Sequence, residues 1–375
     1  MENISTKVYS DLISEVSKDC IPFIPKECSN RNNVIFTLLN PTDLHDFKNE
    51  FKECVGIVYK YLSKSEEGLK KINNLLVNIS KDKTWEGSYA ELVAYAYLIK
   101  NSLHPITSVD ITLSSEDSFA KEFGKPNDTN LDGFIKDISL YFDIKILQDV
   151  PMDIFDGIFC GIRKTLKNDD ILIVPKYDKS KGISDFQKNY KDLFLELYNA
   201  LKTGKQPSII RSKIIEGLSY DLLFANNSHM TATLISPYRH AKKLHTQFFN
   251  YGNKFLKNEK TLIIFVISHL YNRSINFGPN FYRAISRRFF CQYMHSDQKY
   301  NTINPEFVGT ETCFEITKKL SAILFLEDKC LNKSGTDAFL YSNPNADNPL
   351  IKSKIDYPQF NTPLKTYDDF IDDNY

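Results

Sequence analysis

The spacing of apolar and polar residues predicts helices in the first quarter of the chain. Residues 1–80 place apolar side chains three and four positions apart, as in DLHDFKNEFKECVGIVYKYLSKS and GLKKINNLLVNISKD. The segment WEGSYAELVAYAYLIKNS at 85–102 is rich in Ala and Leu and ends in an Asn-Ser pair shortly before a proline. We therefore expect a helical N-terminal region followed by one more helix.

The pattern then changes to short runs that alternate or are continuously apolar, as strands do. Strands are expected at 104–113, 131–136, 139–148 and 169–177, with a helix at 152–167. After the helix at 85–102, the order is strand, strand, strand, helix, strand. This order predicts an α/β or α+β fold with a central mixed β-sheet flanked by helices.

In the second half of the chain, predicted helices continue to alternate with predicted strands. The expected helices and strands are helices at 184–202, 236–258 and 280–294, strands at 261–268 and 320–328, and a hairpin joining 220–225 to 229–236. We expect three parts: a helical N-terminal region at 1–80, a core at 81–270 with a helical insertion, and a C-terminal α/β extension at 271–375. Whether the strand at 169–177 or the one at 261–268 completes the core sheet is left open.

The segment NLDGFIKDISLYFDIKILQD at 130–149 combines strand-like residues with two acids and a lysine. An even-length turn at 137–138 would place residue 134 opposite residue 141, and Asp132 opposite Asp143. Directly opposed residues in a hairpin have Cβ atoms about 4.5–5.5 Å apart. The turn lacks an Asn-Gly pair, so a register shifted by one residue is an alternative.

Strand periodicity places Asp143 and Lys145 on one face and the apolar residues between and beside them on the other. Opposed carboxylates repel one another unless a cation neutralises them, and their hard oxygen atoms suit Mg²⁺. A lysine beside them can orient or help to deprotonate a metal-bound water. Together these groups suit phosphodiester hydrolysis.

Asp132, followed after ten residues by Asp143-Ile144-Lys145, resembles the motif of the PD-(D/E)XK nuclease superfamily, which has the restriction-endonuclease-like fold. The segment from Gly87 to Glu91 is similar to the helix that supplies a further glutamate in that family. The resemblance covers about residues 85–177. The chain departs from the family in having no proline directly before Asp132.

The resemblance implies a metal-dependent endodeoxyribonuclease that acts in restriction or phage defence. It implies that Mg²⁺, or Mn²⁺ in its place, is held by Asp132, Asp143, Glu91 and the backbone carbonyl of Ile144. Lys145 would position or activate the attacking water. One site cuts one strand, so cutting both strands requires a homodimer or two successive nicks. The alternatives are a nuclease for RNA or for branched or damaged DNA, and a nucleic-acid-binding protein without catalysis.

Each of these residues also has a structural explanation. Asp132 and Gly133 form a turn-like pair. Asp143 and Lys145 would also suit a solvated strand face. An acid near a helix N-terminus, such as Glu91, complements the helix dipole.

The charge distribution is balanced, with 47 Lys and Arg against 47 Asp and Glu. No overall field therefore points to nucleic acid or to a membrane. The densest basic clusters are Arg239, Lys242 and Lys243 on one expected helix, and Arg287 and Arg288 on another. They would either contact DNA phosphates or form solvated helix faces.

Other classes of protein are disfavoured by the sequence. Seven cysteines without CxxC spacing indicate neither a disulfide framework nor a zinc site. The apolar run at 261–270 is too short to span a membrane, and the N-terminus lacks the apolar core of a signal peptide. No glycine-rich phosphate loop is present, so no nucleotide cofactor is indicated. We expect a cytoplasmic protein.

Overall fold

The computed structural model describes residues 4–17, 24, 27–28, 34–39, 46–81, 85–101, 103, 111–113, 116–119, 121–123, 129–147, 150–167, 171–177, 183–203, 207–224, 237–268, 270–271, 278–328 and 335–350. The chain divides into two compact units. The first unit comprises Met1–Leu147, Pro237–Tyr271 and Phe277–Tyr375, and the second comprises Gln148–Ser236 and Asn272–Asn276.

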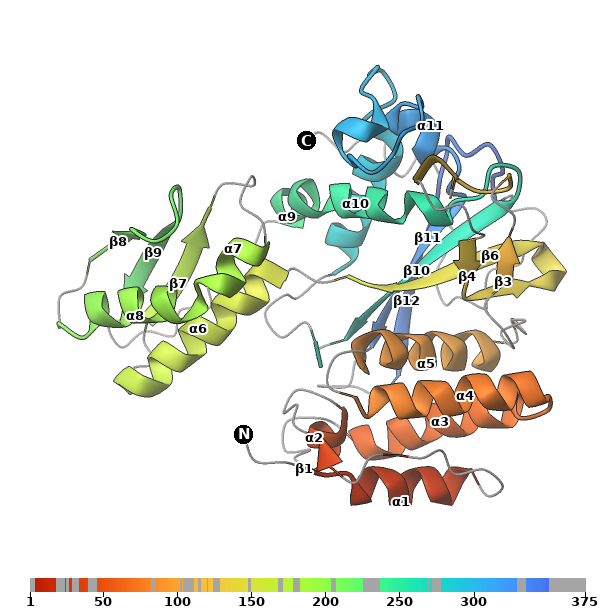
Figure 1. Ribbon diagram of the computed structural model, residues 1–375, viewed down its shortest axis with the longest axis horizontal. Helices are drawn as coiled ribbons and strands as arrows, with labels where there is room; N and C mark the ends of the chain where they lie inside the picture. Colours follow the sequence, from red (N-terminus) through yellow and green to blue (C-terminus); the bar gives the residue numbers. More distant parts are fainter. Residues whose placement is uncertain are drawn as a thin grey trace. The chain divides into compact units, whose positions relative to one another are not determined.

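The first unit is built on a mixed five-stranded sheet with the order β12-β11-β10-β6-β5. Its strands are β5 (Gly133–Ile135), β6 (Leu140–Ile146), β10 (Lys260–Ser268), β11 (Ala322–Asp328) and β12 (Thr336–Ser342). Strands β6, β10 and β11 are parallel, whereas β5 and β12 run antiparallel to their neighbours. Helices cover both faces of the sheet (Figure 1), so the expected α/β class is confirmed.

One face of this sheet is covered by the N-terminal helices (Figure 1). Helix α5 packs against β6 and β10, and α3 and α4 pack against the outer side of α5. Because α5 lies between the sheet and other helices, apolar residues occur all around it rather than along one stripe. The expected helical N-terminal region is confirmed, with α1 (Lys7–Val16), α2 (Val34–Leu39), α3 (Phe47–Leu62), α4 (Glu66–Ile79), α5 (Trp85–Lys100) and a short ladder of β1 (Ile4–Ser5) with β2 (Glu27–Cys28).

Aromatic residues from later helices cover the opposite face. The ring of Phe248 stacks on Phe265 of β10 at 4.5 Å between centroids, and Tyr282 stacks on Phe325 of β11 at 4.6 Å. The expected helix at 236–258 is α9 followed directly by the 3₁₀ helix η3. The elements here are α9 (Pro237–Leu244), η3 (His245–Lys254), α10 (Pro279–Cys291), η4 (Tyr300–Thr302) and α11 (Cys313–Thr317).

The second unit has its own sheet and its own apolar core. The antiparallel sheet has the order β7-β9-β8, and its core is formed by residues such as Phe155, Phe186 and Tyr220. The elements are α6 (Val150–Leu166), β7 (Ile171–Lys176), α7 (Ile183–Lys188), α8 (Tyr190–Leu201), β8 (Ile209–Arg211) and β9 (Ser219–Phe224). The insertion is therefore α/β, whereas a helical one was expected.

The expected three-part division differs from the structure in two respects. The C-terminal part supplies β11 and β12 to the central sheet, so 271–375 is not a separate extension. The strand at 169–177 belongs to the second unit, and β10 completes the core sheet by pairing in parallel with β6. The expected second strand of the hairpin, 229–236, lies outside the described residues.

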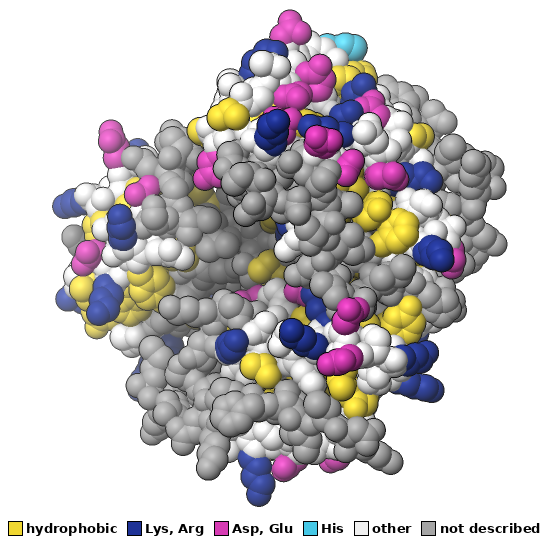
Figure 2. All heavy atoms as spheres, turned by 45° about the vertical axis from the view of Figure 1, so that its right-hand side comes forward, with side chains coloured by type: hydrophobic (Ala, Val, Ile, Leu, Met, Phe, Trp, Pro, Cys, Tyr) yellow, Lys and Arg dark blue, Asp and Glu magenta, His cyan; other side chains and the backbone are white. Residues whose placement is uncertain are grey.

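The surface carries both signs of charge. On the face drawn in Figure 2, Lys and Arg side chains are interspersed with Asp and Glu side chains over the described residues. Among those residues, no helix has the length and apolarity needed to cross a bilayer. Neither property selects a function for the protein.

Candidate active site

Asp132 lies at a break between two strands. The strand expected at 131–136 is divided into β4 (Thr129–Leu131), which pairs with β3 (Ile111–Leu113), and β5, which pairs with β6. Phe134 lies opposite Tyr141, so the expected register is confirmed, and Asp132 falls one residue beyond the end of the ladder. The connection between β5 and β6 is a 3₁₀ turn, η2 (Lys136–Ile138), and not a tight two-residue turn.

The contacts of Asp132 explain why the strand breaks there. Its carboxylate Oδ2 accepts the backbone N–H of Ile144 at 2.6 Å. This oxygen takes the place of the backbone carbonyl that would accept the same N–H if β5 continued. Its backbone oxygen accepts the hydroxyl of Tyr95 at 3.0 Å. Bonds to β6 and to α5 therefore fix this residue from two sides.

Asp143 and Lys145 share one face of β6, as their spacing predicts. The Nζ atom of Lys145 lies 2.5 Å from Oδ2 of Asp143 and 3.1 Å from the carbonyl oxygen of Ile144. Asp143 is only 1% exposed, whereas Phe142 and Ile144 point into the apolar core on the other face. The ion pair is thus held on a central strand and not on a solvated edge.

Burial controls the protonation of this pair. Burial raises the pKa of Asp143 to about 7, the ammonium of Lys145 opposes the rise, and the carboxylate of Asp132 adds to it. For Lys145, burial favours the neutral amine, but the charges of Asp143 and Asp132 outweigh it and raise the pKa. Asp143 is therefore poised to exchange its proton near neutral pH.

Helix η3 adds two groups that the sequence did not identify. The ring of Tyr251 lies 5.7 Å from Nζ of Lys145, and Nζ of Lys254 donates to the backbone oxygen of Asn130. Phe265 of β10 is the ladder partner of Lys145 and contacts the same Tyr251 ring at 5.9 Å. Residues 147–244 separate β6 from η3 in the sequence, so no local pattern connects them.

Glu91 forms an ion pair with a lysine of the neighbouring helix α4. Its Oε2 atom is 2.9 Å from Nζ of Lys71 on α4, and the same ammonium lies 5.9 Å from the ring of Tyr95. Tyr95 in turn bonds to Asp132. The expected additional ligand is therefore linked to Asp132 through Lys71 and Tyr95.

The two basic clusters lie on packed helices. Arg239, Lys242 and Lys243 belong to α9, and Arg287 and Arg288 belong to α10, which packs against α9. Lys242 is exposed and Arg288 donates to Gln292 at 3.2 Å, while the side chains of Arg239 and Lys243 are outside the described part. Helix α9 continues into η3, on the face of the sheet that carries Asp143.

The donor atoms fit a small hard cation. Oδ2 of Asp143 and the carbonyl oxygen of Ile144 both contact one ammonium, so they converge on a single positive charge. Oxygen donors of this kind suit Mg²⁺ or Mn²⁺. Within the described residues, no group of three or more His, Cys, Asp and Glu side chains is gathered for a metal.

Comparisons with protein-family models, with curated proteins and with solved structures found no match to this chain. The assignment of a function therefore depends on the geometry of these residues.

Proposed function

We propose that the protein is a metal-dependent endonuclease of the PD-(D/E)XK kind that hydrolyses phosphodiester bonds in DNA, with a role in restriction or phage defence. The observation that carries the proposal is the grouping of Asp132, Asp143 and Lys145 at β6. Oδ2 of Asp132 accepts the N–H of Ile144, the neighbour of Asp143, and Nζ of Lys145 lies 2.5 Å from Oδ2 of Asp143. A solvated strand face does not account for this arrangement, because Asp143 is almost fully buried on a strand flanked by β5 and β10.

The site residues have distinct tasks in this proposal. Asp132, Asp143 and the Ile144 carbonyl would hold Mg²⁺ or Mn²⁺, with Glu91 available as an accessory group. Such an ion supplies an activated water and neutralises charge on the phosphate. The ammonium of Lys145 donates hydrogen bonds to that water and to the phosphate oxygens as negative charge develops. Asp143 loses its proton near neutral pH and then accepts a cation.

The position of the basic helices supports DNA as the substrate. Helices α9 and α10 carry the densest basic clusters and cover the same sheet face as Asp143 and Lys145. Their Lys and Arg side chains would contact phosphates on either side of the cut bond. Cutting of both strands would then require two copies of the chain or two successive nicks.

Cleavage of supercoiled plasmid and of phage DNA, with Mg²⁺, Mn²⁺ or EDTA, tests the proposal. We expect metal-dependent cutting by the wild type and a loss of roughly 10²-fold or more in Lys145→Ala, because the positioned ammonium is removed. The control is Lys176→Ala, since Lys176 is also a strand lysine paired with an aspartate, Asp221, but lies in the second unit.

Two results would contradict this proposal. One is the absence of cutting of any DNA with either metal. The other is equal activity of Lys145→Ala and the wild type. Cutting of an RNA oligonucleotide instead of DNA, still dependent on Lys145, would favour the RNA nuclease alternative.

A further inference from the structure

The ammonium of Lys145 lies where the proposed metal ion would bind. Its Nζ atom is 2.5 Å from Oδ2 of Asp143 and 3.1 Å from the carbonyl oxygen of Ile144. The proposed function assigns both of these oxygen atoms to Mg²⁺ or Mn²⁺. Mg²⁺ binds oxygen at about 2.0–2.1 Å, so an ion between the two oxygens would overlap the ammonium. The ammonium must therefore leave before a metal ion binds.

The end of the β5–β6 ladder directs the Ile144 carbonyl to this place. Strand β5 begins at Gly133, opposite Phe142, and the N–H of Ile144 is bound by Oδ2 of Asp132. In an antiparallel ladder, the N–H and the carbonyl of one residue point to the same neighbouring strand. The carbonyl of Ile144 therefore points toward the strand break, where Lys145 donates to it.

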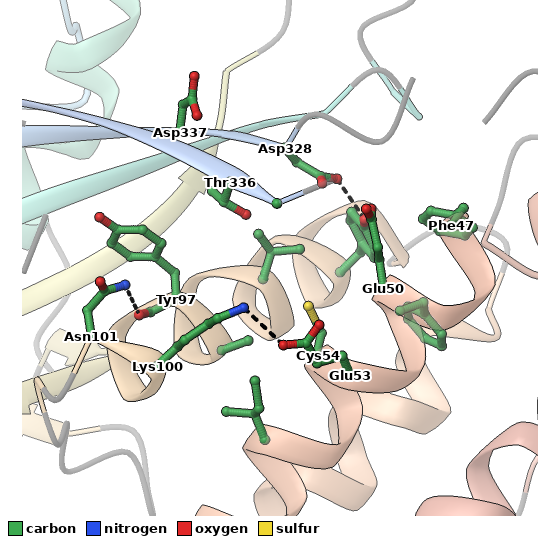
Figure 3. Close-up of a pocket in the computed structure, with 16 residues that line it drawn as sticks. Phe47, Glu50, Glu53, Cys54, Tyr97, Lys100, Asn101, Asp328, Thr336 and Asp337 are labelled. Carbon is green, nitrogen blue, oxygen red and sulfur yellow. Dashed lines mark hydrogen bonds and ion pairs between the residues drawn. The ribbon is translucent and has the colours of Figure 1, made fainter. Parts of the chain in front are cut away.

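Burial distinguishes this ion pair from one on the surface. Lys100 and Glu53, at the edge of the cavity drawn in Figure 3, pair at 2.9 Å with both side chains more than half exposed. Water solvates those two charges even when the pair opens. The carboxylate of Asp143 is almost fully buried, so it needs a cation beside it whenever it is ionised. Either the ammonium or a metal ion meets this need.

The ring of Tyr251 offers a second position to the ammonium. Its centroid lies 5.7 Å from Nζ of Lys145, near the limit of about 6 Å for a cation–π contact. The flexible four-carbon side chain of Lys145 allows the ammonium to move closer to this ring when it leaves Asp143. The ring contacts Phe265 at 5.9 Å between centroids, and Phe265 stacks on Phe248. Packing therefore holds the ring while the lysine moves.

We propose that the ammonium of Lys145 closes the metal site, and that Tyr251 is the positioning residue that receives this ammonium when a divalent cation binds. The inference rests on the proposed function, which assigns a metal ion to these oxygens. The exchange keeps a cation beside Asp143 before and after metal binding. It also leaves the ammonium next to the site, within reach of a water or a phosphate oxygen.

Mn²⁺ binding to the full-length chain without nucleic acid tests the competition, with free Mn²⁺ measured by electron paramagnetic resonance. Lys145→Met keeps the length of the side chain and removes its charge. We expect this variant to bind Mn²⁺ roughly tenfold or more tightly than wild type, because no ammonium has to be displaced.

Lys254→Met is the matched control. The charge of Lys254 acts on Asp143, but its ammonium donates to the backbone oxygen of Asn130. This variant removes repulsion through space without opening the site, so its gain in Mn²⁺ affinity should stay below roughly threefold. Equal gains in the two variants, or no gain in Lys145→Met, would overturn the competition.

Two substitutions test the role of Tyr251. Tyr251→Leu removes the aromatic face and should weaken Mn²⁺ binding roughly threefold to tenfold, because the displaced ammonium loses its second position. Tyr251→Phe keeps that face and should restore the wild-type affinity. If Tyr251→Leu binds Mn²⁺ as tightly as wild type does, the ring does not receive the ammonium.

Nuclear magnetic resonance of the chain labelled with ¹³C at the lysine ε-carbon follows the ammonium directly. The Lys145 signal is identified by its absence in Lys145→Met. Saturation with diamagnetic Mg²⁺ should move this signal upfield in wild type and in Tyr251→Phe, because the ε-protons approach a ring face. An unmoved wild-type signal overturns the inference, and this holds even if Tyr251→Leu does not fold.

These readouts separate the inference from the proposed function, because no nucleic acid is present. Plasmid cleavage together with an unmoved Lys145 signal would overturn the inference alone. Absence of cleavage together with the expected exchange would contradict the nuclease proposal alone. Failure of Mn²⁺ to bind both wild type and Lys145→Met would overturn the inference as well.

Discussion

At the residue scale, Asp143 shows how the fold sets the chemistry of one side chain. Its carboxyl is removed from water on a central strand, beside one ammonium and one further carboxylate. The ammonium offsets only part of the cost of burial, so the pKa rises to about 7. Such a group changes its charge at the pH where a cation would bind. An exposed aspartate does not change its charge at that pH.

This shift predicts that Asp143 reduces folding stability as pH rises. The folded protein binds the proton more tightly than the unfolded chain does, so the free energy of unfolding falls between about pH 4 and pH 7. Asp143→Asn does not titrate. The variant should therefore gain roughly 1–3 kcal/mol relative to wild type between pH 4 and pH 8.

Urea unfolding of both proteins at several pH values measures this difference. Asp185→Asn, on a short helix of the second unit, serves as the control for the same substitution away from the candidate site. A constant difference between Asp143→Asn and wild type across this pH range would rule out a raised pKa for Asp143.

At the scale of elements, the site depends on the contact between α5 and the β5–β6 hairpin. Tyr95 reaches from α5 to the backbone of Asp132, and its ring contacts Phe142 of β6 at 6.4 Å between centroids. The same helix carries Glu91 one turn earlier. A small displacement of α5 would therefore affect the candidate site.

We expect Tyr95→Phe to lower the free energy of unfolding by about 1 kcal/mol, because the bond to Asp132 is lost while the ring still packs on Phe142. Nuclease activity should fall more in this variant than in Tyr59→Phe, a half-buried tyrosine on α3. Chemical denaturation and plasmid cleavage provide the two measurements. Equal activity in both variants would show that the Tyr95 hydroxyl does not position Asp132.

At the scale of the whole molecule, the chain forms two units that each bury their own core. The central sheet, its helices and the candidate site belong to the first unit, and no strand of that sheet comes from the second. The second unit lies between β6 and β10 in the sequence, although these two strands pair directly. It is therefore an insertion into the connection between neighbouring parallel strands.

Replacing residues 148–236 by a flexible linker of about ten Gly and Ser residues should leave the first unit folded. The reason is that no ladder of the central sheet is lost. The near-ultraviolet circular dichroism and a cooperative thermal transition should persist. Phe265→Ala in the full-length chain is the comparison, since loss of a buried ring of the central sheet should cost about 3–5 kcal/mol. An unfolded deletion variant would show that the two units depend on each other.

The sequence by itself determined the elements and part of the candidate site. Periodicity placed the helices of the N-terminal region and strands β6, β10 and β11, because each carries a clear apolar pattern of its own. Alternation also fixed which face of β6 carries Asp143 and Lys145. The hairpin register followed from local geometry, and it brought Asp132 close enough to Asp143 for their charges to interact. These are short-range properties that neighbouring residues encode.

Only the tertiary structure decided which strands pair in the central sheet and which distant residues meet there. Strand β10, not β7, completes the core, because parallel pairing across a long connection leaves no local signal. The same pairing brings Tyr251 to Lys145 and the charge of Lys254 to Asp143, and helix packing gives Glu91 its partner Lys71. The raised pKa of Asp143 likewise depends on burial by distant segments. The local sequence pattern determines the helices and strands, whereas long-range packing determines which residues become neighbours and how those residues are charged.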